Sequence, residues 1–267
     1  MSRDLAVLRH FFNDTKSIIG SFHSFLYFLM SVWYALIKKQ RMSLMKKRYS
    51  RNIACGIGLL ILFAIWTIAV QTIDVKPIGV DNTSIGFSSI NSWFHSLTGV
   101  NMALYNITDW LGLVPVVMCM VFALVGLAQA IKRRSILKVD FDIILLGVYY
   151  AVVILGYVVF EMIPINYRPI LINGIMEASY PSSTTLLVLS VMMTVVFQAR
   201  KRVKNGIIKE IITIATILFS LFMVVGRMIS GVHWLTDIIG SLFLSVGLFL
   251  LYKGGVLLWN STRSFRN

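Results

Sequence analysis

Six long apolar runs divide this chain, and they constrain its fold more than any other feature. The runs lie near residues 53–73, 111–131, 143–163, 182–199, 209–226 and 237–258. A helix needs about 20 apolar residues to cross the hydrocarbon core of a bilayer. Because the bilayer core offers no water to backbone polar groups, a single spanning segment must form its hydrogen bonds internally, as a helix does. The sequence therefore predicts an all-α, polytopic membrane protein with a core of six transmembrane helices.

The basic charge of the chain follows the same division. The formal net charge is +14, a value that could suggest a nucleic-acid partner. A nucleic-acid groove binder gathers its basic residues on one face or along one helix, whereas here they fall in short clusters between the apolar runs. We therefore expect the lipid bilayer, and no nucleic acid, as the partner of this chain.

The basic clusters also predict the topology. They precede the first run, follow the second and follow the fourth, and comprise Lys46, Lys47, Arg48 and Arg51, then Lys132, Arg133, Arg134 and Lys138, then Arg200, Lys201, Arg202, Lys204 and Lys209. Loops rich in lysine and arginine remain on the cytoplasmic side. Residues 74–110, 164–181 and 227–236 are then expected to face the non-cytoplasmic side, in a protein of the cell membrane.

The expected organisation has three parts: an N-terminal segment at 1–48, a six-helix membrane domain at 49–260 and a short cytoplasmic tail at 261–267. The N-terminal segment contains a further apolar stretch at 18–37. This stretch forms either an additional membrane helix or an interfacial helix, or else it precedes a true start at Met42 or Met45.

The first outward segment carries a helical pattern of its own. Ile90, Trp93, Phe94 and Leu97 recur at helical spacing and predict a helix lying at the membrane interface. Such a helix either anchors the chain through its aromatic residues or controls lateral entry of a lipid.

Cofactor chemistry has little support in the sequence. Cys55 and Cys119 both lie inside apolar runs, away from the oxidising exterior that would join them. No residues with the spacing of a metal-ligand cluster occur in the sequence. We expect no disulfide, no metal and no cofactor.

Three polar groups of residues occur at the outward ends of the runs. They are Arg168-Pro169 within Asn166-Tyr167-Arg168-Pro169, then Ser179-Tyr180-Pro181-Ser182-Ser183-Thr184-Thr185, then Arg227, His233 and Asp237. A proline in the first helical turn and hydroxyl residues as a cap are typical of a helix start, whose free N–H groups favour an anion. We expect such a helix start at Pro181.

The third group predicts an activated histidine. His233 and Asp237 are four residues apart, so on a helix they share a face and the carboxylate can hold one imidazole nitrogen. The other nitrogen is then available as a base or nucleophile. Arg168 and Arg227 offer planar forks for phosphate oxygens. Together these residues predict a phosphate-binding cage with a histidine that can attack phosphorus.

These motifs resemble those of the type 2 phosphatidic acid phosphatase superfamily of membrane lipid phosphatases, over about residues 50 to 258. That family has an Arg-Pro pair preceded by a lysine, a Pro-Ser-Gly-His sequence, and an arginine, a histidine and an aspartate at fixed spacing. Here the first and third signatures correspond to Arg168-Pro169 and to Arg227, His233 and Asp237. The second signature is reduced to its first two residues, at 181–182.

The resemblance implies a role for each matching residue. His233 would be the nucleophile that forms a phosphohistidine, and Asp237 would orient it. Arg168, Ser182 and Arg227 would bind the phosphate. The implied reaction is hydrolysis of a phosphate from a membrane lipid phosphate or polyprenyl diphosphate at the outer face. The alternative is a catalytically impaired member that binds a phospholipid or has a structural role.

Three positions depart from the family pattern. Glu161 stands where the phosphate-binding lysine would be, and one interpretation pairs it with Arg168, since intramembrane carboxylates tend to find partners. Ser183 replaces the glycine, and Thr184 replaces the histidine that protonates the leaving group. His95 is the other outward histidine of the six-helix domain and thus the candidate to replace that acid.

The missing acid also bears on the substrate. General acid catalysis contributes roughly 10² to 10⁴-fold to rate when the leaving oxygen is basic, as in a lipid alcohol. A phosphate leaving group has a second pKa of about 6, so it departs without a proton. Thr184 therefore favours a polyprenyl diphosphate over a lipid phosphomonoester.

Overall fold

The computed structural model describes residues 2–266, with side chains described at positions 30, 32–34, 37–40 and 42–263. It contains six helical segments long and apolar enough to span a membrane, which confirms the predicted all-α, six-span core. They are the Val32–Thr72 part of α1 (Ser2–Thr72), α3 (Met102–Leu111) with α4 (Leu113–Arg133), α5 (Phe141–Met162), α6 (Ser183–Arg202), α7 (Gly206–Ile229) and α8 (Leu235–Arg266). The protein is an integral membrane protein.

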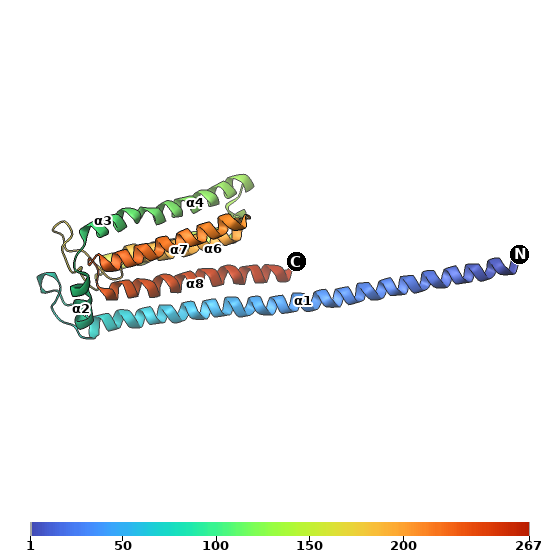
Figure 1. Cartoon of the computed structure of the whole chain (residues 1–267), viewed down its shortest axis with the longest axis horizontal. Helices are drawn as coiled ribbons and strands as arrows, with labels where there is room; N and C mark the ends of the chain where they lie inside the picture. Colours follow the sequence, from blue (N-terminus) through green and yellow to red (C-terminus); the bar gives the residue numbers. More distant parts are fainter. Residues whose placement is uncertain (1, 267) are drawn as a thin grey trace.

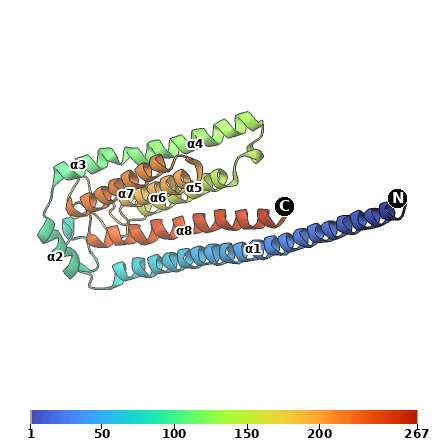
Figure 2. The ribbon, with the colours of Figure 1, turned by 45° about the vertical axis from the view of Figure 1, so that its right-hand side comes forward.

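The spans run side by side as a bundle, and α1 lies along α8 and continues past it (Figure 1). A turned view shows the same arrangement, with α2 (Ser88–Thr98) lying across one end of the bundle (Figure 2). A Cβ added to Gly56 would lie 3.0 Å from the Gly247 carbonyl oxygen, so the backbones of α1 and α8 approach closely there. Small residues permit such close helix packing in membranes.

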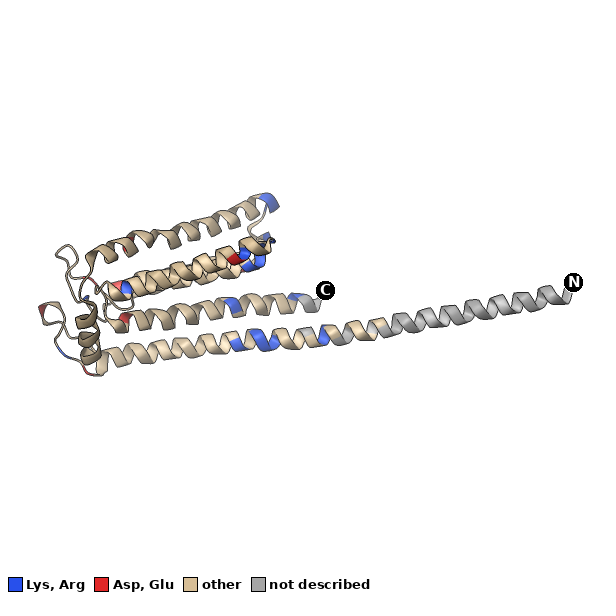
Figure 3. Ribbon diagram, in the orientation of Figure 1, with Lys and Arg blue, Asp and Glu red and all other residues tan. Residues whose placement is uncertain are grey.

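The two ends of the bundle differ in charge. Lysine and arginine gather at the end remote from α2, which we call the basic end (Figure 3). The opposite end carries residues 73–101 and 163–182, and we call it the loop end. The two short 3-10 helices divide in the same way, with Val80–Asn82 at the loop end and Ile136–Lys138 at the basic end.

A buried carboxylate holds three helices together at the basic end. Asp142 of α5 is paired with Lys201 Nζ and Arg202 Nη2, each at 2.7 Å, and accepts a hydrogen bond from Gln198 Nε2 at 3.0 Å. Its backbone carbonyl accepts a bond from the Tyr252 hydroxyl of α8 at 3.2 Å. These contacts fix the register of α5, α6 and α8 at the end opposite the loops.

The N-terminal region forms one helix with the first span. α1 continues without interruption through residue 48. Most of the apolar stretch at 18–37 lies outside the residues whose side chains the structure describes. The helix predicted around Ile90 and Leu97 is present as α2.

Candidate active site

A hairpin brings Arg168 into the site. Residues 166–179 fold back on themselves at Asn173 and Gly174, which have φ angles of 52° and 79°. Positive φ at two successive residues is the requirement of the tightest hairpin turns, and Asn-Gly is the preferred sequence for it. The Arg168 N–H donates to the Glu177 carbonyl at 3.1 Å across this hairpin. The loop therefore holds Arg168 beside the residues that lead into α6.

A tight turn presents the histidine. Gly231 has a φ of 69°, and His233 lies two residues before α8 begins at Leu235. The prediction that His233 and Asp237 share a helix face is therefore wrong. Asp237 instead accepts the Trp234 N–H at 2.9 Å and caps the start of α8, while its Oδ2 lies 3.6 Å from His233 Nδ1. The carboxylate thus approaches the imidazole from the first turn of the helix.

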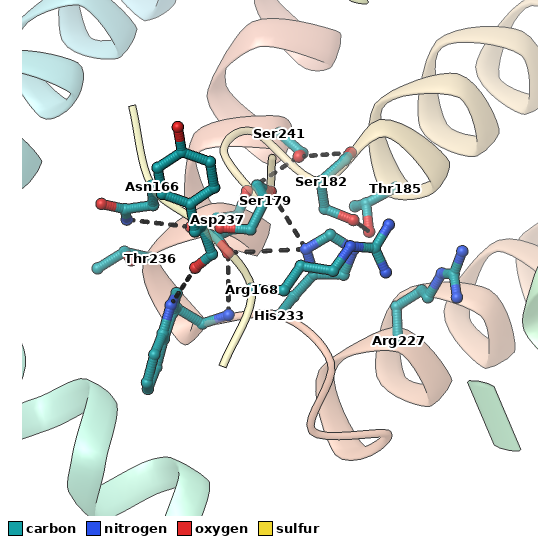
Figure 4. Close-up of polar contacts among 12 residues, drawn as sticks. Asn166, Arg168, Ser179, Ser182, Thr185, Arg227, His233, Thr236, Asp237 and Ser241 are labelled. Atoms are coloured by element: carbon teal, nitrogen blue, oxygen red, sulfur yellow. Dashed lines mark hydrogen bonds and ion pairs between the residues drawn. The ribbon is translucent and has the colours of Figure 1, made fainter. Parts of the chain in front are cut away.

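The tautomer of His233 follows from its second neighbour. Its Nδ1 lies 3.1 Å from the Ser179 carbonyl oxygen. Figure 4 shows this contact between the two residues as a dashed line. Since a carbonyl can only accept, Nδ1 carries the hydrogen and Nε2 carries the lone pair. Nε2 is buried and has no hydrogen-bond partner among the described residues. Burial lowers the pKa of His233 to about 4, with Asp237 opposing the shift and Arg168 adding to it.

Two buried arginines share one aromatic ring. Arg168 and Arg227 are 7% and 1% exposed, and their guanidinium carbons lie 5.7 and 4.8 Å from the centre of the Tyr105 ring. Arg168 Nη2 is paired with Glu177 Oε2 at 3.0 Å, so the suggested pairing of Arg168 with Glu161 is wrong. The Glu177 partner follows from the hairpin, which sets the two residues opposite each other, whereas Glu161 is exposed.

Arg227 is held mainly by protein groups. Its Nη2 donates to Asp109 Oδ1 at 2.7 Å and also to the Thr184 hydroxyl, and its Nη1 lies 3.5 Å from the Tyr105 carbonyl oxygen. Its Nε has no partner within the described part of the chain. Thr184 therefore fixes the position of Arg227 with Asp109.

The start of α6 leaves its backbone donors available. Ser182 is the N-cap residue, so Pro181 lies before the helix. The prediction that Pro181 belongs to the first helical turn is therefore wrong. The Ser182 hydroxyl donates to Thr185 Oγ1 at 3.1 Å, and no side chain caps the helix. The first N–H groups of a helix have no partner within it. Those of Ser183 and Thr184 thus face the loop end as donors suited to an anion.

Sequence analysis assigned no role to several residues that shape the site. They are Tyr105, Asp109, Asn166, Glu177 and the Ser179 carbonyl. Asn173-Gly174 is a strong hairpin signal, and it could have revealed that residues 166–168 lie opposite 177–179. No local pattern marks Asp109, because it reaches Arg227 through the packing of α3 on α7.

An apolar cavity lies beside the two residues that hold Arg227, Asp109 and Thr184. Its volume is about 460 Å³, and its polar end is formed by Asp109, Ser183 and Thr184. The remaining wall is mostly apolar and includes Val116, Cys119, Val153, Ile154 and Leu187, together with the rings of Tyr150 and Tyr157. Between positions 2 and 266, the described residues contain no cluster of three or more histidine, cysteine or acidic side chains that could hold a metal.

Fold and site together define a polytopic helical membrane protein with a buried cationic site next to a histidine. The chain belongs to the PAP2 superfamily, whose family model matches residues 114–260, and this confirms the resemblance seen in the sequence. No curated protein matches the chain. Its fold is similar to the crystal structure of a transmembrane PAP2 type phosphatidylglycerolphosphate phosphatase from Bacillus subtilis, with a TM-score of 0.55 and 18% identity, covering 75% of this chain and 94% of that one.

Proposed function

We propose that this protein is a membrane lipid phosphatase that transfers a phosphoryl group to His233 and then to water. The observation that carries the proposal is a set of buried nitrogens without partners among the described residues. They are Nε and Nη1 of Arg168, Nε of Arg227 and Nε2 of His233. Membership of the PAP2 superfamily supports the same reaction class.

These nitrogens fit a phosphate group in kind and in charge. Nearly all buried polar groups in proteins are hydrogen-bonded, and an unpaired one costs about 1–3 kcal/mol, more when charged. The free N–H groups of Arg168 and Arg227 can donate hydrogen bonds to an anion, whereas Nε2 of His233 carries a lone pair and can act as a nucleophile. A phosphate bound by the arginines would satisfy the donors and present its phosphorus to Nε2.

The two chemical steps then use groups already in place. The Nε2 lone pair attacks phosphorus, the P–O bond to the lipid breaks, and its electron pair leaves with the lipid oxygen. The N–P bond makes the ring cationic, and Asp237, 3.6 Å from Nδ1, stabilises that charge. Water then attacks phosphorus, the N–P pair returns to His233, and phosphate and a proton are released.

The proposed substrate is a lipid whose leaving group needs no proton. Thr184 hydrogen-bonds Arg227 and cannot donate a proton at neutral pH, so a lipid monophosphate is favoured as leaving group over a lipid alkoxide. Thr184 also lines the apolar cavity, which would accommodate a hydrocarbon chain next to the anion site. A polyprenyl diphosphate combines both features.

We further propose that the loop end faces the non-cytoplasmic side of the cell membrane. Lysine and arginine concentrate at the basic end (Figure 3), and loops rich in these residues remain in the cytoplasm. The site would then act on lipids of the outer leaflet.

The test is phosphate release by purified protein in the presence of a chelator, with a polyprenyl diphosphate, phosphatidic acid and phosphatidylglycerol phosphate compared. His233→Ala and His233→Gln should abolish release while thermal unfolding stays close to that of the wild type. Wild type quenched with alkaline detergent should contain a phosphohistidine, recognised by its loss on later acid treatment, that both variants lack. Release that persists in the variants would refute the assignment of His233.

A second function is favoured by two observations. Nη2 of Arg227 is occupied by Asp109 and Thr184, and position 161 is glutamate, so the anion site has fewer free cationic groups than the family signatures provide. A catalytically impaired protein that binds a phospholipid would show these features. Saturable lipid binding that needs Arg168, with no release of phosphate from any substrate, would establish this alternative.

A further inference from the structure

The helix α2 presents two different faces. Ile90, Trp93 and Leu97 point away from the protein and are 45%, 58% and 65% exposed. α2 contains no lysine, arginine or acidic residue, and its only titratable side chain is His95. Such a face is apolar, aromatic and uncharged, as in helices that lie in a membrane interface.

The opposite face of α2 contacts the turn that carries His233. His95 Nε2 lies 3.1 Å from the Gly231 carbonyl oxygen, and its ring is 5.7 Å from that of Trp234. Asn91 is 1% exposed and donates to the Thr236 hydroxyl at 3.1 Å. His95 and Asn91 thus hold the turn on both sides of the nucleophile.

The residues that follow α2 pack closely against the same turn, the one that carries His233. A Cβ on Gly231 would lie 1.8 Å from the Gly99 carbonyl oxygen, so only glycine fits there. The Asn101 N–H donates to the Ser230 carbonyl at 2.9 Å. A shift of α2 therefore cannot occur without a shift of the turn.

We propose that α2 is a bilayer-anchored positioning helix: its apolar face lies in the headgroup region of the membrane, and its polar face sets the position of His233 through His95 and Asn91. The proposed occupant of the apolar face is the lipid surface, because α2 lies across the loop end where the spans emerge (Figure 1). The catalytic consequence rests on the proposed phosphatase function. His95 and Asn91 act through the turn and are positioning residues.

The lipid contact is tested first, without reference to catalysis. In nanodiscs containing brominated phosphatidylcholine, we expect the wild type to lose more tryptophan fluorescence than Trp93→Phe, since bromine quenches a residue that it touches. Trp93→Phe retains the other tryptophans and is therefore the matched background. Equal quenching of the two proteins would show that α2 does not touch the lipid and would overturn the proposal.

The coupling to the turn is tested at His95. His95→Ala should lower kcat roughly tenfold or more with little change in KM, because small displacements of a reacting group reduce rate strongly. His95→Gln keeps a donor and should recover most of the loss, and Ser92→Ala on the exposed side should have no effect. Equal kcat values for His95→Ala and wild type would refute the coupling, and so would an equal loss in His95→Gln and His95→Ala.

A third measurement separates this inference from the proposed function. Amide hydrogen exchange at residues 231–234 should accelerate in His95→Ala, and also in a Trp93→Ser, Leu97→Ser double variant, but not in Leu137→Ala, which alters an exposed leucine at the basic end. If the wild type hydrolyses no lipid but these changes occur, the proposed function fails and the positioning helix stands. Unchanged exchange alongside normal turnover would overturn the positioning helix and leave the proposed function intact.

Discussion

Thr184→His is the substitution that most directly examines how this site activates its leaving group. Thr184 is the second residue of α6 and lines the polar end of the 460 Å³ cavity, so an imidazole can be accommodated toward that cavity. We expect the variant to gain turnover of phosphatidic acid while gaining little on a polyprenyl diphosphate. The physical reason is that only the monoester releases a basic alkoxide, which needs a proton.

Two opposing effects set the magnitude. The substitution removes the hydroxyl that accepts from Arg227, a loss of about 1 kcal/mol, or about fivefold in rate. A positioned acid adds roughly 10² to 10⁴-fold for the monoester and almost nothing for a leaving group of pKa near 6. The monoester rate should therefore rise about 20-fold or more, and the diphosphate rate should fall by at most about fivefold.

The assay is kcat/KM for both lipids in mixed micelles, measured side by side on wild type and variant. Ser183→His is the matched control, because it places the same ring at the adjacent position of the helix. The ratio of monoester to diphosphate turnover should change only in Thr184→His. An unchanged ratio in that variant, with an intact fold, would show that leaving-group protonation does not determine the substrate preference.

Three further predictions concern binding, pH and stability. Arg168→Lys should weaken binding of inorganic phosphate or vanadate about 10- to 100-fold, since it removes the two free guanidinium donors. Glu177→Gln should tighten binding of the same anions, because it removes a carboxylate that competes for Arg168. Competitive inhibition by these anions measures both changes in affinity. The pKa of His233 is about 4 against an ordinary value of 6.5, so the fold favours the neutral imidazole. The stability that this preference contributes is complete above pH 6.5 and is lost as the pH falls toward 4. Nitrogen NMR of labelled histidine, assigned with His233→Gln, should show no protonation of His233 between pH 6 and 8. Asp142→Asn should destabilise the bundle by about 2 kcal/mol, less than the loss of a fully enclosed ion pair, because Lys201 and Arg202 reach solvent. Thermal unfolding in detergent measures the loss. An unchanged midpoint would show that Asp142 does not stabilise the packing of the helices.

Periodic and compositional features of the sequence were sufficient to predict the spans. Each apolar run became a membrane-length helix, since hydropathy over about 20 residues is a local property. The approach of the Asp237 carboxylate to His233 was predicted, but the shared helix face was not correct, because a helix was assumed to extend back to residue 233. Gly231 and the cap that Asp237 gives to Trp234 place the helix start later.

Electrostatic partners were harder to predict because they depend on tertiary contacts. Glu161 stands closer in sequence to the arginine than Glu177 does, yet the hairpin selects Glu177. Asp109 reaches Arg227 from more than a hundred positions away. Spacing along a chain determines which residues share an element, but not which elements meet.

The first span also contributes to the site, although the family model begins at residue 114. Trp66 Nε1 donates to the Thr236 carbonyl at 3.1 Å, next to Asp237, and the Thr67 hydroxyl is 2.8 Å from that of Tyr180, just before α6. A shortened chain limited to the matched region would retain every signature residue and lose these two supports. The structural unit that supports the site is therefore larger than the segment that the family model recognises, because it includes the first span.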